Sequence, residues 1–81
     1  MHTNLELYTT SHCHLCEEAE ALLVQVGEEL SFNYNKIEIS DNEDLLTTYG
    51  AKIPVLRNMS TQQELCWPFD KQSIYQLIGE I

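Results

Sequence analysis

The residues of this 81-residue chain best suited to chemistry are two cysteines that lie three positions apart. Cys13 and Cys16 form a C-x-x-C pair, and the alternating segment from Leu5 to Thr9 precedes them as an expected strand. At the start of a helix, unpaired backbone N–H groups and the helix dipole stabilise a thiolate. We therefore expect Cys13 to be the nucleophile that attacks a disulfide, and Cys16, one turn into the helix, to be the resolving thiol.

Two histidines flank the first cysteine. A protonated imidazole of His12 or His14 would lower the pKa of the neighbouring thiol, whereas Glu17 and Glu18 in the same turn would raise it. The two Cys and two His are also zinc ligand types, but four ligands within five residues would strain a tetrahedral site, so we expect no metal. Each histidine is either a substrate contact or a solvated loop residue.

An amphipathic helix is expected to follow the cysteines. Apolar residues recur there at helical spacing while charged residues take the other faces; the apolar set is Leu15, Ala19, Leu22, Leu23 and Val26. The helix ends either at Gly27 or as late as Leu30. Residues 35–39 then alternate like a half-buried strand, and Ser40 with Glu43 has the pattern of a capping box that begins a short second helix.

The C-terminal half predicts a hairpin and a last helix. Residues 53–57 and 63–67 are expected strands joined by a short turn, which favours antiparallel pairing. Asp70 is a favourable N-cap for a helix whose apolar stripe is Ile74, Leu77, Ile78 and Ile81. The predicted order is βαβαββα, an α/β fold whose first two strands are parallel, and the length leaves room for one domain over residues 1–81.

The composition excludes several classes of function. Thirteen acidic and four basic residues leave a formal net charge of −9, which repels nucleic acids and anionic membrane surfaces. No apolar run reaches the ~18 residues of a membrane span, and the first residues lack the charged and apolar regions of a signal peptide. We therefore expect a cytoplasmic monomer that binds neither nucleic acid nor membrane.

Three segments together resemble the glutaredoxin branch of the thioredoxin-fold superfamily. They are the loop and C-x-x-C at residues 9–16, Ile53-Pro54 ahead of the third strand, and residues 64–70 before the last helix. In combination they are similar to a small bacterial glutaredoxin-like family with a C-H-L-C motif. The resemblance covers nearly the whole chain and implies a thioredoxin-like fold, with a four-stranded mixed sheet and helices on both faces.

The resemblance also implies a thiol-disulfide oxidoreductase that needs no cofactor beyond its own dithiol. Pro54 corresponds to the cis-proline that faces the cysteines in this fold, and the backbone N–H and C=O of Ile53 would pair with an extended, cysteine-containing ligand. The partners implied are a disulfide-containing protein or small thiol and an electron donor. The alternative is a noncatalytic module that docks a protein partner or a metal in the same groove.

The remaining cysteine and the aromatic residues are expected to serve packing. Cys66 lies in the last expected strand, on the opposite face from Leu65, and is expected to be a packing residue, while Trp67, Phe69 and Tyr75 are expected at the core or its edge. Tyr8, close to the cysteine loop, is a further candidate for the wall of the thiol groove.

We predict that glutathione is a poor substrate. Glutaredoxins that use it carry a basic residue shortly before the first cysteine and a Gly-Gly-Asp-like stretch after the fourth strand, which hold its carboxylates. Here these places read Ser11-His12 and Trp67-Pro68-Phe69-Asp70, so that Asp70 is left to contact the amino group. Reduction of a glutathione mixed disulfide should be much slower than by a conventional glutaredoxin assayed alongside, and comparable rates would contradict this.

Overall fold

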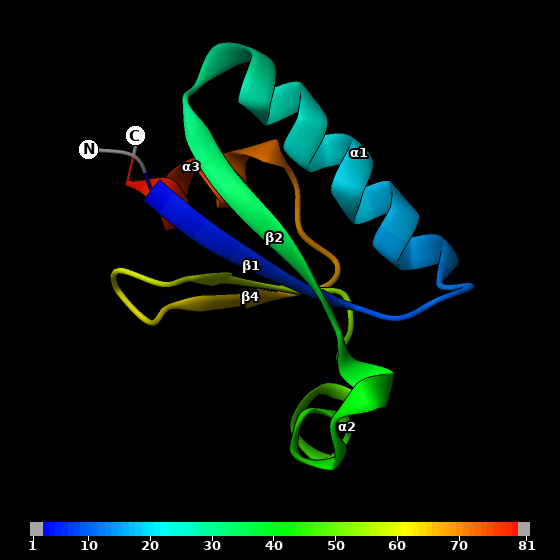
Figure 1. The fold of residues 1–81 in the computed structure, drawn as a ribbon. Coiled ribbons are helices and arrows are strands. Elements are labelled where there is room, and N and C mark those ends of the chain that lie inside the picture. Colours follow the sequence, from blue (N-terminus) through cyan, green and yellow to red (C-terminus); the bar gives the residue numbers. More distant parts are fainter. Residues whose placement is uncertain (1–2, 80–81) are drawn as a thin grey trace.

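A mixed four-stranded sheet organises the chain (Figure 1). The computed structural model describes residues 3–79, and its strands are β1 (Thr3–Thr9), β2 (Phe32–Glu38), β3 (Val55–Asn58) and β4 (Glu64–Cys66). They lie in the order β2-β1-β3-β4. β1 and β2 are parallel, whereas β3 pairs antiparallel with both β1 and β4, so the predicted parallel pair and C-terminal hairpin are confirmed.

Three α-helices complete the predicted βαβαββα order. They are α1 (His14–Glu29), α2 (Glu43–Tyr49) and α3 (Lys71–Ile78), and a 3₁₀ turn, η1 (Ile39–Asp41), precedes α2. α1 and α3 pack on one face of the sheet, while α2 lies beyond one end of the sheet and packs on the other face only there (Figure 1). Helices therefore contact both faces as expected, but most of the second face is left without a helix.

Strand alternation divides the apolar side chains between two cores. The larger core joins the sheet to α1 and α3, and its buried members include Leu5, Leu7, Leu23, Leu56 and Ile74. Burying one such side chain contributes about 1.5–3 kcal/mol. The smaller core, around Tyr8, Ile39, Tyr49 and Val55, holds α2 against the opposite face.

The predicted N-cap of α3 is confirmed, whereas the predicted N-cap of α2 is not. Asp70 caps α3 as predicted, because its carboxylate accepts a hydrogen bond from the Ser73 amide at 2.9 Å. The expected Ser40–Glu43 capping box is wrong: Asn42 caps α2 by accepting from two backbone amides, and Ser40 lies in η1. Burial of Ile39 in the smaller core turns the chain before the helix begins.

The structure differs from the predicted elements at the start of β2 and at Leu15, and it decides where α1 ends. β2 begins at Phe32, three residues earlier than expected, because Phe32 packs against the larger core. Of the two predicted ends of α1, the later one is confirmed, because the helix continues to Glu29 with Leu30 as its C-cap, and Gly27 lies inside it. Leu15 is 44% exposed, since the buried side of α1 begins at Cys16. Ile81, the last member of the expected C-terminal stripe, lies outside the described residues.

Asn58 joins the hairpin to the last helix. It is the one buried polar side chain in the described part of the chain, with 2% of its surface exposed. Its side-chain amide donates to the Leu77 carbonyl at 2.8 Å, while its oxygen accepts from the amides of Ser60 and Thr61. The expected turn residue is thus the end of β3 and a link between β3 and α3.

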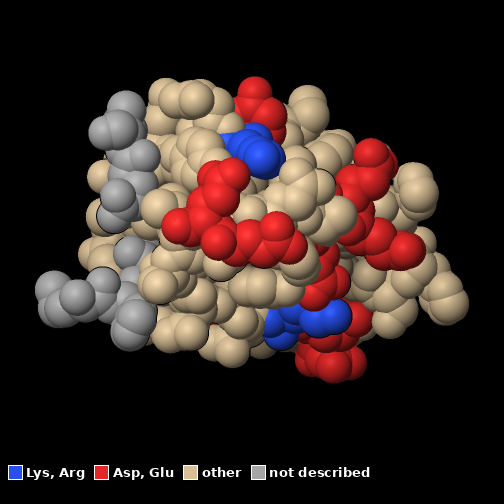
Figure 2. Space-filling model, turned by 90° about the horizontal axis from the view of Figure 1, so that it is seen from above, with Lys and Arg blue, Asp and Glu red and all other residues tan. Residues whose placement is uncertain are grey.

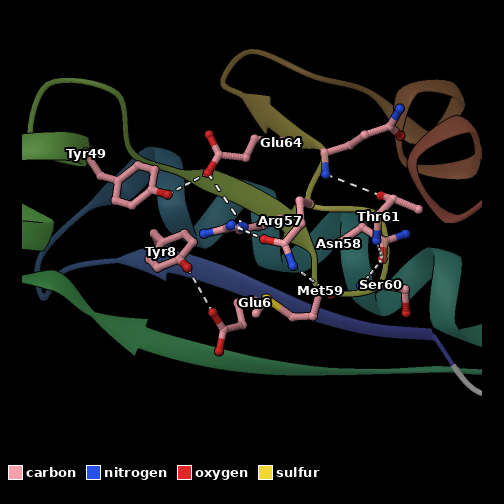
Figure 3. A network of polar contacts seen from close by, with 11 residues as sticks. Glu6, Tyr8, Tyr49, Arg57, Asn58, Met59, Ser60, Thr61 and Glu64 are labelled. Carbon is pink, nitrogen blue, oxygen red and sulfur yellow. Dashed lines mark hydrogen bonds and ion pairs between the residues drawn. The ribbon is translucent and has the colours of Figure 1, made fainter.

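A row of polar side chains crosses the face of the sheet that α2 leaves exposed (Figure 3). The strand register aligns Glu6, Arg57 and Glu64 on neighbouring strands, and Arg57 Nε lies 3.9 Å from the Glu64 carboxylate. Tyr8 donates to Glu6 at 2.8 Å and stacks on Tyr49, with 4.3 Å between the ring centroids. Tyr8 is therefore buried in the smaller core, and its expected place in the thiol groove is wrong.

We predict that the free energy of unfolding falls at alkaline pH because of Tyr49. The hydrogen bond to Glu64, at 2.5 Å, and then burial raise the pKa of Tyr49 from 10.0 to about 12. Between these values the unfolded chain loses the phenolic proton before the folded chain does, so the free energy of unfolding falls as the pH rises. Tyr49→Phe should cost about 1 kcal/mol at neutral pH through the lost hydrogen bond, and should weaken this fall. Urea unfolding at several pH values tests it, and parallel pH profiles for the two proteins would contradict it.

Candidate redox site

The two cysteines of the C-x-x-C pair form a disulfide at the start of α1. Their Cα atoms are 5.2 Å apart. Cys13 is the N-cap residue, with extended backbone, and Cys16 lies in the first turn. The Cys16 amide donates to Cys13 Sγ at 3.1 Å, a bond that in the reduced protein would stabilise a Cys13 thiolate. The helix N-terminus thus surrounds Cys13 with the donors that the sequence predicts for a nucleophile.

The two sulfur-bearing residues differ in exposure. Cys16 has 5% of its surface exposed and belongs to the buried side of α1, whereas Cys13 is half-buried. A molecule approaching from solvent therefore meets Cys13 first. This asymmetry suits one attacking and one resolving thiol.

A hollow of about 290 Å³ opens beside the disulfide, and we call it the thiol hollow. It is bounded by the end of β1, the loop that follows, the first turns of α1 and the end of β2; its lining residues are Thr9, Thr10, Ser11, His12, Cys13, Cys16, Glu17, Glu20, Lys36 and Glu38. The parallel register explains the contribution of β2, because it places Lys36 opposite Leu7 and Glu38 opposite Thr9.

Polar contacts order the β2 wall of the thiol hollow. Glu38 accepts hydrogen bonds from the Ser11 hydroxyl at 3.3 Å and from the Ser40 hydroxyl at 2.9 Å. Hydrogen bonds from Thr10, then from Ser40, hold the pKa of Glu38 below its usual value, so this carboxylate stays ionised. Every donor to Glu38 named here is uncharged, and its negative charge is therefore not neutralised.

The neighbouring carboxylate, Glu20, has a different environment. It accepts a hydrogen bond from the Tyr34 hydroxyl at 2.9 Å and lies 3.5 Å from the Lys36 ammonium. Lys36 compensates this charge directly. Lys36, Glu38 and Glu20 were not predicted as site residues. Alternation alone marks Lys36 and Glu38 as the solvent-facing side of the strand, and it gives no sign that the first turns of α1 lie beside them.

The structure brings one of the two flanking histidines into the thiol hollow. His12 lines the hollow, is exposed, and has a left-handed backbone with φ 61°. His14 is the first residue of α1, its side chain is 85% exposed, and its Nε2 lies 3.6 Å from the Glu18 carboxylate. His14 therefore points along the helix surface and does not line the hollow.

The other predicted substrate-binding residues do not line the thiol hollow. Pro54 is fully buried and its peptide bond with Ile53 is cis. The Ile53 amide donates to the Tyr49 carbonyl at 3.1 Å, which occupies the donor that we expected a ligand to use. Asp70 caps α3 and borders a separate hollow with Pro68 and Phe69.

Cys66 is exposed, so its expected role as a packing residue is wrong. Leu65 pairs across the hairpin with Leu56 and faces the larger core, so Cys66 points to the opposite face of a strand at the edge of the sheet. The expected roles of the aromatic residues are confirmed: Phe69 is buried, and Trp67 packs edge-on against it with 5.1 Å between ring centroids. Tyr75 packs at the edge of the larger core.

Within residues 3–79, no three His, Cys, Asp or Glu side chains gather closely enough to hold a metal ion. In the same part of the chain, no helix combines the length and the apolar character that crossing a membrane requires.

Comparison with known proteins places the chain in a family. A family model described as a glutaredoxin-like domain (DUF836) matches residues 4–79. The chain belongs to the glutaredoxin-like family. Comparison of this glutaredoxin-like domain with curated proteins gives no significant match.

Solved structures share the fold of this glutaredoxin-like domain. A crystal structure of a structural genomics target protein from X. campestris has 35% sequence identity and a TM-score of 0.76, covering 89% of this chain and 91% of its own. A solution NMR structure of a protein from Nitrosomonas europaea has 31% identity and a TM-score of 0.85, covering 98% of this chain and 94% of its own. The predicted thioredoxin-like α/β fold is confirmed by these neighbours and by the mixed sheet.

We predict that alkylation separates the three cysteines of this glutaredoxin-like domain. Without reductant, iodoacetamide should modify Cys66 alone, because the other two sulfurs are joined and Cys66 is exposed. After reduction at neutral pH, Cys13 should react well before the buried Cys16, by roughly fivefold if the helix N-terminus contributes about 1 kcal/mol to its ionisation. Peptide mapping by mass spectrometry measures the order, and faster labelling of Cys16 than of Cys13 would overturn the assigned roles.

Proposed function

We propose that this glutaredoxin-like domain is a thiol-disulfide oxidoreductase. The observation that carries the proposal is the Cys13–Cys16 disulfide at the N-terminus of α1, with both cysteines on the thiol hollow and Cys16 the more buried of the two. Family membership supports the same reading. A dithiol that closes and opens reversibly transfers two electrons without a further cofactor.

The proposed reaction has two exchange steps. In the reduced protein, the Cys13 thiolate attacks one sulfur of a substrate disulfide, and the other substrate sulfur leaves as a thiolate. The Cys16 thiolate then attacks Cys13 in the mixed disulfide and displaces the substrate. The substrate disulfide has then gained two electrons and takes up two protons, while Cys13 and Cys16 are oxidised to the disulfide. A dithiol or thiol electron donor restores the reduced form by the reverse exchange.

The other predicted substrate-binding residues differ in how close they lie to the reacting cysteines. His12, on the thiol hollow, contacts the substrate beside the reacting sulfur, and the Ile53 carbonyl with Pro54 offers a second contact to an extended chain. His14 and Asp70 have lesser parts, since His14 faces Glu18 and Asp70 caps α3. The substrate is a disulfide-containing protein or small thiol, and the protein acts as a monomer in the cytoplasm.

A simple oxidation experiment distinguishes this function from a binding module that docks a partner or metal. Treatment with dithiothreitol and then a mild oxidant should remove two hydrogens reversibly, measured as intact mass. The Cys66→Ser variant is the matched control, because it should show the same change. A mass that does not change, or a metal retained through dialysis, would instead favour the binding module.

We predict that the two exchange steps can be separated by mutation. Cys13→Ser should abolish reduction of a peptide disulfide, whereas Cys16→Ser should still form a mixed disulfide at Cys13 that accumulates because nothing resolves it. Cys66→Ser should keep nearly the full rate, since Cys66 lies on an edge strand outside the thiol hollow. Rates with dithiothreitol as donor and non-reducing mass spectrometry measure these outcomes. Activity that survives in Cys13→Ser would disprove the mechanism.

A further inference from the structure

Both cysteines line the thiol hollow, so it lies next to the place where a substrate disulfide would react. Its lining includes both cysteines together with charged side chains from α1 and β2. A chain whose cysteine is joined to Cys13 brings its neighbouring side chains close to this surface. The charges on the hollow therefore act on the substrate during the exchange itself.

The charges of the thiol hollow do not cancel. Three carboxylates line it, from Glu17, Glu20 and Glu38, against the single ammonium of Lys36. Lys36 lies 3.5 Å from Glu20 and compensates that residue. Glu38 accepts bonds only from uncharged donors, and Glu17 has no ion pair within residues 3–79. Two negative charges remain for a ligand.

The surroundings do not supply the missing positive charge. On the face shown in Figure 2, acidic side chains spread widely and basic side chains form only isolated groups among them. His12 is the remaining titratable side chain on the hollow besides the cysteines. A cationic side chain of the substrate would therefore meet attraction at the hollow, and an anionic one repulsion.

From this arrangement we infer that the domain prefers disulfides whose reacting cysteine lies beside lysine or arginine, with Glu17 and Glu38 as the residues that determine this specificity. The inference rests on the proposed function. The expected ligand is a basic segment of a protein or peptide rather than an anionic small thiol. Exposed ion pairs are each worth a few-fold, so a change from two basic to two acidic neighbours should lower kcat/KM by about tenfold.

Three peptides test the inference. They share one sequence and one disulfide, and differ in the two residues that flank the reacting cysteine, which are both Lys, both Gln or both Glu. The measured quantity is kcat/KM with dithiothreitol as donor at about pH 8, where free imidazoles are largely neutral. The ratio of the Lys rate to the Glu rate within one variant cancels any general loss of activity by that variant.

Removing negative charge from the hollow should lower this ratio, and removing positive charge should raise it. Glu17→Gln with Glu38→Gln should reduce a ratio of about ten to about two, whereas Lys36→Gln, which leaves Glu20 uncompensated, should raise it. The matched control is Glu28→Gln with Glu43→Gln, which changes the net charge equally at positions outside the hollow. The control should keep the wild-type ratio.

The outcomes separate failure of the charge preference from failure of the oxidoreductase function. Equal rates on the Lys and Glu peptides would overturn the charge preference while leaving the oxidoreductase function intact. A control variant that loses the ratio as fully as the Glu17 and Glu38 double variant would also overturn it, since net charge would then be the cause. Failure of the wild-type protein to reduce any of the three peptides would remove the proposed function as well. Should the double variant not fold, Glu17→Gln alone, on the exposed helix surface, should show part of the loss.

Discussion

Burial of the apolar side of α1 against the sheet holds the two cysteines in the geometry that exchange requires. Ala19, Leu23 and Val26 are all fully buried, and Cys16 continues the same side of the helix. The helix axis is thereby fixed relative to β1, and the chain between them leaves Cys13 at the cap, with its sulfur toward the hollow. The same packing that stabilises the fold therefore makes one thiol accessible and shields the other.

With thirteen acidic and only four basic residues, the protein uses tyrosine hydroxyls as hydrogen-bond donors to several of its carboxylates. Each of its four tyrosines donates to a glutamate, in the pairs Tyr8–Glu6, Tyr34–Glu20, Tyr49–Glu64 and Tyr75–Glu29. Hydroxyl donors stabilise a carboxylate without neutralising it, so the negative charge persists after the hydrogen bonds form. The phenol pKa rises in these pairs, and Tyr34, like Tyr49, reaches about 12. Of these four glutamates only Glu20 lines the thiol hollow, where Lys36 compensates it, so the negative charge left at the redox site belongs to Glu17 and Glu38.

Much of the fold was predictable because local sequence patterns determine where its helices, caps and turns form. The period of α1, the cap at Asp70 and the short turn before β4 each depend on neighbours in sequence. The errors arose where a distant contact outweighed a local pattern. Ser40 and Glu43 have the spacing of a capping box, but burial of Ile39 formed η1 and left Asn42 as the cap.

The sequence alone determined the element order, the family resemblance and the C-x-x-C pair, because spacing and periodicity are properties of neighbouring residues. Tertiary structure decided what surrounds that pair. Parallel pairing of β2 with β1 brought Lys36 and Glu38 to the cysteines, while Pro54 and Asp70 were placed outside the hollow. Cys66 was exposed because the short second helix covers only one end of its face. Which strand adjoins a site depends on contacts between residues far apart in the chain, and no local pattern contains them.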